Sequence, residues 1–349
     1  MNRNRRRGAM WAAGTGLAVA GAVTAGKLLA RRERREPDDA AGERFDELPA
    51  EDLSPVVSFD GTLLHVRAAG DPENPVLLFA HGHSVDLTTW HYQWKELSRE
   101  YRCILFDQRG HGRSGKAAGG DHSLQAMGRD IAAVLDAAVP EDRPVVVLGH
   151  SMGGMGVLGL AESRPDLFRT RIAGAVFADT AAAELVRGAA GALGVRLVTL
   201  VPNLARRFAR TITRDAVRTR APKSDLAFLV ARLTNFGPHA SPSMVEYVVG
   251  VSMRSPIEVW TDGIAALMEM DLRHAIEHVR CPALVIVGDL DRLTPPSSAL
   301  ALKDALPDGR LVVLEGAGHM APMERHDQFN DVLRGFLSDA FARSAEAVR

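Results

Sequence analysis

The sequence predicts an α/β fold built on a mostly parallel sheet, and three observations lead to this prediction. Short apolar runs recur along the chain, and each is followed by a loop with small or charged residues. Segments of helical periodicity lie between consecutive runs, as Leu124 to Val139 illustrates. From Ala181 to about Met270 the chain has helical segments and little that looks like a strand. The alternation favours a parallel sheet with helices on both faces, and the long interruption favours an inserted helical lid.

The composition is that of an ordinary globular protein. The chain has 349 residues, 46% of them hydrophobic and 24% charged, which suffices for one large α/β domain with an insertion or for two smaller domains. A formal net charge of −1 argues against a general nucleic-acid-binding protein. The two cysteines, Cys103 and Cys281, lie in or beside runs that we expect to form separate buried strands. We therefore predict two core thiols and no disulfide.

The first 35 residues differ from the rest of the chain. They contain nine Lys or Arg and one Glu, and nineteen uncharged residues, Gly8 to Gly26, lie between the basic clusters. That run is long enough to cross a bilayer as one helix, so we predict that residues 1–35 are an anchor at the cell membrane. The alternatives are a secretory signal cleaved near Ala18-Val19-Ala20, with a secreted product, and an Ala-rich helix without a membrane role. Residues 36–55 are polar and acidic, and we predict a linker.

The α/β core is expected in two parts, residues 56–180 and 271–340, separated by the lid at residues 181–270. At its start, two short runs flank Asp60-Gly61, which is a hairpin signal. With these two runs the core has eight predicted strands. They are Val56 to Phe59, Leu63 to Arg67, Val76 to Ala80, Cys103 to Phe106, Val145 to Leu148, Ile172 to Ala178, Pro282 to Val287 and Leu311 to Leu314.

A candidate nucleophile stands at the end of the run Val145 to Leu148. The stretch Gly149-His150-Ser151-Met152-Gly153 has the form G-x-S-x-G and is predicted to be a sharp turn between a strand and a helix. Small residues on either side of Ser151 let the backbone bend tightly enough to present the hydroxyl in a cleft. The pattern is short and recurs by chance, so its value depends on partners elsewhere in the chain.

Two partners follow at the ends of the last two predicted strands. Asp291 stands in the loop after Val287, where its carboxylate can accept the N–H of an imidazole. We prefer Asp291 to Asp289, because Asp289 is nearer the strand and better placed to bond local backbone. His319 lies in a glycine-flanked loop after Leu314. Of the twelve histidines, it is the only one that lies after the strand that precedes Asp291 and in a loop ahead of the predicted terminal helix. The order Ser, Asp, His completes a candidate triad.

Main-chain donors for an oxyanion are expected in two places. The backbone of His83 follows the run Val76 to Ala80 and a glycine, and the N–H of Met152 follows the nucleophile. The pair His81 and His83 could instead suggest a metal site, but no further cluster of matching spacing accompanies it, so no metal and no cofactor is predicted. The loop Asp107 to Ser114 has no phosphate-binding motif, and we expect a network of Asp107 and Arg109 to pin it beside the cleft.

Five landmarks in order make the chain resemble the α/β-hydrolase fold superfamily, from about Val56 to Leu337. They are His81-Gly82, Asp107 to Ser114, Gly149 to Gly154, Gly288 to Asp291 and Gly318-His319. The elbow looks most like that of monoacylglycerol-lipase-like esterases and cofactor-free haloperoxidases. The arrangement His81-Gly82-His83 to Trp90, together with the anchored amino terminus, is similar to that of membrane-anchored actinobacterial hydrolases. Haloalkane dehalogenases and epoxide hydrolases of this fold have an aspartate where Ser151 stands, which counts against both activities.

The resemblance implies a serine hydrolase that cleaves a lipid-like or small apolar carboxylic ester through an acyl-enzyme. In this role Ser151 is the nucleophile, His319 the general base and then acid, and Asp291 the group that orients the imidazole. The expected partners are a small-molecule or lipid ester and the membrane, with no nucleic acid and with the oligomeric state left open. The same triad would serve acyl transfer, haloperoxidase-like chemistry, or lactone or amide hydrolysis. A binding or signalling module with little turnover is the alternative outside enzymes.

Overall fold

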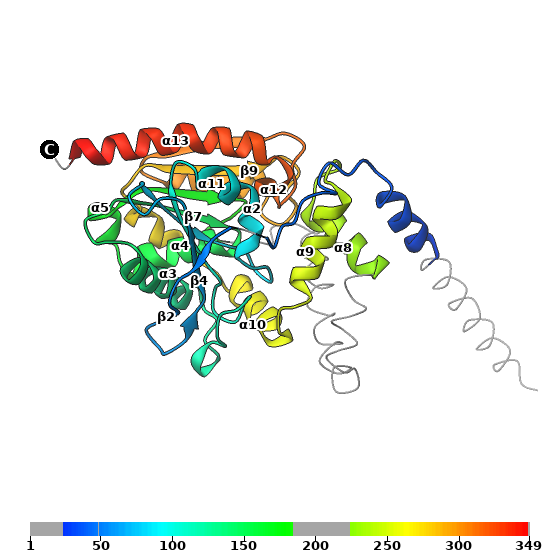
Figure 1. The fold of residues 1–349 in the computed structure, drawn as a ribbon, viewed down its shortest axis with the longest axis horizontal. Helices are drawn as coiled ribbons and strands as arrows, with labels where there is room; N and C mark the ends of the chain where they lie inside the picture. The colour runs from blue at the N-terminus through cyan, green and yellow to red at the C-terminus, as the bar shows by residue number, and fades with distance from the viewer. Residues whose placement is uncertain (1–23, 48, 184–223, 348–349) are drawn as a thin grey trace, which may run out of the picture.

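The computed structural model describes residues 24–47, 49–183 and 224–347, and its centre is a twisted eight-stranded sheet (Figure 1). The strand order is β1-β4-β6-β5-β7-β8-β9-β10. The first two pairs, β1-β4 and β4-β6, are antiparallel, and all other pairs are parallel. The bounds are β1 (Glu51–Asp52), β4 (Val66–Ala69), β5 (Val76–Ala80), β6 (Arg102–Phe106), β7 (Val145–His150), β8 (Ile172–Ala178), β9 (Ala283–Gly288) and β10 (Gly309–Leu314). The predicted mostly parallel eight-stranded sheet is confirmed.

An apolar layer covers each face of the sheet. Successive residues of a strand point to opposite faces, so each strand contributes side chains to both layers. Along β5, Leu78 belongs to one apolar cluster and Phe79 to the other. The first cluster includes side chains of α3 (Leu124–Ala138), α4 (Met152–Ser163) and α11 (Pro296–Ala305). The second includes those of α2 (His91–Leu97) and α13 (His326–Ala347). Every residue of the central strands β5, β7, β8 and β9 is buried, which explains why these runs lack an alternating polar pattern.

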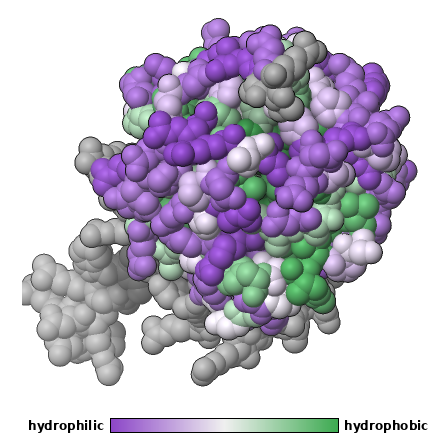
Figure 2. Space-filling model, turned by 90° about the vertical axis from the view of Figure 1, so that its left-hand side faces the viewer, coloured by the Kyte–Doolittle hydropathy of each residue, from purple (hydrophilic) through white to green (hydrophobic). Residues whose placement is uncertain are grey.

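Within the described residues, five short helices connect these elements. They are η1 (Leu87–Trp90), η2 (Ala118–Gly120), α5 (Leu167–Thr170), η3 (Arg273–His278) and α12 (Ala321–Glu324). The face on the left of Figure 1 is mostly hydrophilic, with apolar side chains gathered in narrower areas (Figure 2). Cys103, on β6, and Cys281, just before β9, are both buried and free, as predicted.

The hairpin at Asp60-Gly61 forms, but it is not part of the main sheet. Strands β2 (Val56–Val57) and β3 (Leu63–Leu64) pair antiparallel as a separate two-stranded sheet. The main sheet begins instead with β1, which lies in the predicted linker, and continues with β4. The number of strands in the main sheet was therefore predicted correctly although one of its members was not. A two-residue strand of Glu and Asp carries no apolar periodicity that would reveal it.

The lid region contains three described helices, between β8 and β9. They are α8 (Asp225–Asn235), α9 (Pro242–Ser252) and α10 (Ile257–Met268), and residues 184–223 of the predicted lid lie outside the described residues. The side-chain hydroxyl of Ser224 accepts the N–H of Ala227 and so caps the start of α8. The buried residues of α8 and α9 form a third apolar cluster, which includes Met320 beside the predicted base.

The end of the predicted anchor and the predicted linker that follows it pack against both the lid and the core. Residues 24–33 form a helix beside α8, and Arg34 bonds to Asp225 of α8 and lies 2.8 Å from Glu246 of α9. Further on, Phe45 is only 3% exposed and belongs to the third apolar cluster. This single aromatic residue is hidden in a segment whose average composition is polar. We call residues 24–47 the N-terminal strap.

Residues 1–23 of the predicted membrane anchor, which include most of the uncharged run Gly8 to Gly26, lie outside the described residues. Among the helices that the structure describes, none is both long enough and apolar enough to cross a membrane.

The loop after β6 is held by two separate buried networks, not by one. Asp107 accepts hydrogen bonds from the N–H groups of Leu87 and Arg113 and lies 2.9 Å from His65 Nδ1. Burial opposes ionisation of Asp107, but these partners hold its pKa below the ordinary value. Arg109, which is fully buried, instead makes a two-pronged ion pair with Asp130, at 2.6 and 2.7 Å.

Candidate active site

Ser151 occupies a sharp turn between β7 and α4. Its backbone has φ 53° and ψ −121°, a conformation that non-glycine residues rarely adopt and that costs on the order of 1–3 kcal/mol. The backbone that follows this turn also passes very close to the end of β5. A Cβ on Gly153 would lie 2.2 Å from the carbonyl oxygen of Ala80, so no larger residue fits there without a shift. This is the local geometry that the G-x-S-x-G pattern predicts.

The structure brings the three predicted triad residues into one line of contacts. His319 Nε2 lies 2.9 Å from Ser151 Oγ, and His319 Nδ1 lies 2.9 Å from Asp291 Oδ2. Asp291 and His319 are 4% and 6% exposed, whereas Ser151 is partly exposed. With a proton on Nδ1 facing the carboxylate, Nε2 is free to accept the hydroxyl proton of the serine.

Asp291 is held by its own loop as well as by His319. It accepts the backbone N–H groups of Leu293 and Thr294, at 2.8 and 3.0 Å, and the Thr294 hydroxyl donates to Oδ2 at 2.6 Å. Burial opposes its ionisation, but the charge and hydrogen bond of His319 and the donors of Thr294 lower the pKa of Asp291. The group facing the imidazole is thus a carboxylate at neutral pH. Thr294 was not singled out from the sequence.

Asp289 does not face the imidazole. Its Oδ1 accepts the backbone N–H of Gly316 at 2.7 Å and so joins the ends of β9 and β10. This matches the reason for which Asp291 was preferred.

Two buried side chains that were not predicted as site residues support His319 from behind. His150 Nε2 donates to the main-chain carbonyl of His319 at 2.8 Å. Asp179, at the end of β8, accepts the N–H of Gly288 at 2.9 Å and that of Ala321 at 3.2 Å, so it ties together the loops that carry Asp291 and His319. Burial and the nearby charge of Asp291 raise the pKa of Asp179 well above its ordinary value. Its position at a strand end is the sequence signal that could have indicated it.

The predicted oxyanion donors lie on the two segments that meet at the serine. Met152 is the first residue of α4, where backbone N–H groups have no acceptor within the helix. His83 follows Gly82, and a Cβ on Gly82 would lie 3.3 Å from Ser151 Cβ, so this loop passes directly beside the nucleophile. Burial lowers the pKa of the His83 side chain to about 4, and its ring is therefore uncharged at neutral pH.

The ring nitrogens of His81 are used within the protein. Nδ1 donates to the carbonyl of Gly82 at 2.8 Å, and Nε2 accepts the N–H of Gln108 at 2.9 Å. In the described parts of the chain, no group of three or more His, Cys, Asp or Glu residues is arranged to hold a metal ion.

Comparison with known proteins places this geometry in a large group of related enzymes. A protein that carries the name carbamate hydrolase, from Caulobacter sp. (strain K31), is 27% identical over 299 residues, which cover 80% of this chain and 96% of that protein. The 3-oxoadipate enol-lactonase 2 of Acinetobacter baylyi is 26% identical and is covered to 98%, by 81% of this chain. The structure of a thermophilic esterase from Thermogutta terrifontis matches 83% of this chain and 99% of that one, with a TM-score of 0.65 and 25% identity.

The α/β hydrolase fold family matches residues 75–326, a span that includes the nucleophile turn, the Asp291 loop and the His319 loop. The parallel sheet, the strained serine between β7 and α4, and this match over most of the chain agree. The chain belongs to the α/β-hydrolase fold family and is a hydrolase.

Proposed function

We propose that this hydrolase cleaves carboxylic esters through a Ser151-His319-Asp291 triad and an acyl-enzyme. The observation that carries the proposal is the continuous line of contacts, 2.9 Å from Ser151 Oγ to His319 Nε2 and 2.9 Å from His319 Nδ1 to Asp291 Oδ2. Its relatives include proteins named as an esterase and an enol-lactonase, both of which act on ester bonds.

The chemistry follows from these contacts. His319 Nε2 takes the proton of the Ser151 hydroxyl as the oxygen attacks the ester carbonyl, and the resulting imidazolium is stabilised by the Asp291 carboxylate. The N–H groups of Met152 and His83 stabilise the negative charge that develops on the carbonyl oxygen; the loss of one such donor costs about 3–4 kcal/mol in related chemistry. His319 then protonates the leaving alcohol, and water, deprotonated by His319, releases the acid and regenerates Ser151.

The substrate in this proposal is a lipid-like or small apolar ester. The lid helices contribute a buried apolar cluster that reaches Met320, the neighbour of His319, which favours an apolar acyl group over a charged one. A series of p-nitrophenyl esters from acetate to palmitate, with the p-nitrophenyl monoester of succinic acid as the charged comparison, tests this. The kcat/KM values should be higher for the apolar acyl groups, and a preference for the charged one would contradict the proposal.

A fluorophosphonate probe tests the nucleophile. We expect covalent labelling of the wild-type protein and no labelling of Ser151→Ala. Ser163→Ala is a matched control, because the Ser163 hydroxyl only bonds the carbonyl groups of its own helix. If the Ser151→Ala protein still reacts, another residue is the nucleophile.

Lactone hydrolysis is the second candidate, and the enol-lactonase among the relatives favours it. The same triad opens a cyclic ester, with the difference that the leaving alcohol stays attached to the acyl group. Parallel assays with a γ-lactone and an open-chain ester of equal size distinguish the two candidates by the ratio of their kcat/KM values.

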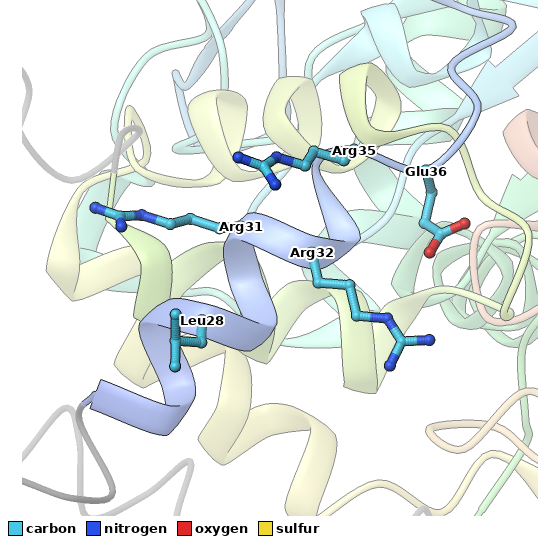
Figure 3. A pocket seen from close by; sticks show the side chains of 5 residues that line it. All are labelled: Leu28, Arg31, Arg32, Arg35 and Glu36. Carbon is cyan, nitrogen blue, oxygen red and sulfur yellow. The ribbon is translucent and has the colours of Figure 1, made fainter.

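We also propose that the N-terminal segment attaches the protein to the cell membrane. The uncharged run Gly8 to Gly26 supports this, as do the arginines that follow it. Leu28, Arg31, Arg32, Arg35 and Glu36 line a surface pocket of about 330 Å³, in which the arginine side chains extend away from the helix (Figure 3). Such side chains suit the headgroups of anionic lipids.

Fractionation of cells that produce the full chain tests the attachment. We expect the protein in the membrane fraction after washing with alkaline carbonate. A product that begins near residue 20 and is recovered outside the cell would identify a cleaved signal instead.

A further inference from the structure

Glu324 is a buried carboxyl group that contacts two parts of the chain far apart in sequence. Its Oε1 accepts the backbone N–H of Gly318 at 2.9 Å, directly before His319. Its Oε2 accepts the N–H of Gly237 at 2.6 Å, in the lid just after α8. One carboxylate therefore connects the loop of the proposed base with the lid.

The two segments that Glu324 joins are packed backbone to backbone. A Cβ on Gly318 would lie 2.5 Å from the carbonyl carbon of Phe236, and a Cβ on Gly237 would lie 2.4 Å from the carbonyl oxygen of Gly316. The N–H of Met320 adds a hydrogen bond to the carbonyl of Asn235, at 3.1 Å. The residues before and after His319 are thus both bound to this junction.

The connection continues through the lid to the N-terminal strap. Arg232, on α8 and 7% exposed, donates to the carbonyl groups of Gly237 and Pro238. Its Nε lies 3.2 Å from Glu33 Oε2, on the strap. A chain of contacts thus runs from the strap through Arg232, Gly237 and Glu324 to the His319 loop.

We propose that Glu324 is a positioning residue whose ionised carboxylate fixes the lid and the His319 loop in the arrangement that brings His319 to Ser151. This inference rests on the proposed function, because it assigns a role in setting the geometry of the triad. Two backbone N–H groups face the carboxylate, and a protonated carboxyl is a weaker acceptor for both. Loss of the negative charge loosens the junction and lets the imidazole move away from the serine.

The environment of Glu324 makes its charge sensitive to pH near neutrality. Burial raises the pKa of Glu324 to about 7, although the N–H donors of Gly237 and Gly318 and the charge of Arg232 act in the opposite direction. The charged or titratable groups that face it are Arg232 from α8 and Asp179 from the end of β8, with His319 and Arg325 near it in the chain. Because the active form is the ionised one, activity that depends on Glu324 decreases as the pH falls below about 7.

The pH dependence of kcat/KM for p-nitrophenyl acetate tests the proposal on the full chain. If both His319 and Glu324 must be unprotonated, log(kcat/KM) rises with a slope of two on the acid side in the wild-type protein. In Glu324→Gln, the side-chain oxygen can accept from only one of the two backbone donors, and the NH₂ group faces the other. We expect kcat to fall about tenfold or more and the acid-side slope to become one.

Glu315→Gln is the matched control, since Glu315 is an exposed glutamate in the same loop and should keep both the rate and the slope of two. Arg232→Gln is a second variant that leaves Glu324 in place. Removing this positive charge raises the pKa of Glu324 further, so the acid limb should move to higher pH.

A wild-type slope of one, or a Glu324→Gln protein with the wild-type rate and slope, would overturn the proposal. If Glu324→Gln fails to fold, the other two results test the proposal. A wild-type slope of two and an acid limb that moves to higher pH in Arg232→Gln support it, and a slope of one or no such shift overturns it. Absence of ester hydrolysis and of Ser151 labelling in the wild-type protein would instead overturn the proposed function and this inference with it.

Discussion

His150 donates a hydrogen bond from Nε2 to the main-chain carbonyl oxygen of His319, at 2.8 Å, and both residues are buried. The residue that precedes the proposed nucleophile thus holds the backbone of the proposed base. Burial lowers the pKa of His150 to about 3, so its ring is neutral at any pH at which the enzyme would work. The contact is therefore a permanent one and does not act as a pH switch.

We expect His150→Phe to destabilise the protein by about 1–3 kcal/mol, because it leaves a buried carbonyl without its donor. Its kcat should fall about tenfold as the backbone of His319 loses a restraint. Urea unfolding and ester hydrolysis measure the two effects. His274→Phe removes only an exposed contact with Glu162, at 2.9 Å. It should change the free energy of unfolding by less than about 1 kcal/mol and leave kcat unchanged. Wild-type kcat in a folded His150→Phe protein would show that the contact does not position the base.

The geometry around Asp291 predicts a large difference between two nearby aspartates. Asp291→Asn keeps the size of the side chain but removes the carboxylate that fixes the imidazole tautomer. By analogy with the corresponding change in other triads, kcat should fall about 10⁴-fold. Asp289→Asn should reduce kcat little, since Asp289 bonds only the backbone of Gly316. Equal losses in the two variants would contradict the assignment.

The buried pair of Arg109 and Asp130 predicts a strong effect on stability. Arg109→Ala leaves the Asp130 carboxylate buried without its partner, which should cost about 3–5 kcal/mol of unfolding free energy. The exposed pair Arg310 and Asp339 has a similar distance, 2.9 Å, and is the control: Arg310→Ala should cost less than about 1 kcal/mol. Chemical denaturation of both variants measures the contrast.

Asp107 predicts a dependence of stability on pH. Its pKa is lowered in the folded protein, so the stabilisation is present above the unfolded-state value of about 3.9 and is lost as the pH falls through the folded-state value. Asp107→Asn should therefore be less stable than the wild-type protein at pH 7, with the difference shrinking below pH 4. Asp39→Asn, at an exposed position, is the control and should change the free energy of unfolding at pH 7 by no more than about 0.5 kcal/mol.

The sequence predicted the sheet and the meeting of Ser151, Asp291 and His319 because each of these residues lies in the turn or loop after a parallel strand, and the carboxyl ends of parallel strands share one edge. His150 and Glu324 could not be found in the same way. Their roles depend on loop conformations and on contacts between segments 87 to 169 residues apart. The packing of Phe45 was missed for a related reason, since one buried aromatic side chain does not change the polar average of its segment.

The N-terminal strap has a practical consequence for making the protein in shortened form. Its buried Phe45 and the contacts of Glu43 with His91 and Lys95, both at 2.9 Å, join it to α2, while Arg34 joins it to the lid. Truncation at the apparent start of the core, near residue 56, would remove these contacts and the edge strand β1. A version cut to remove the apolar N-terminus should therefore begin close to residue 24.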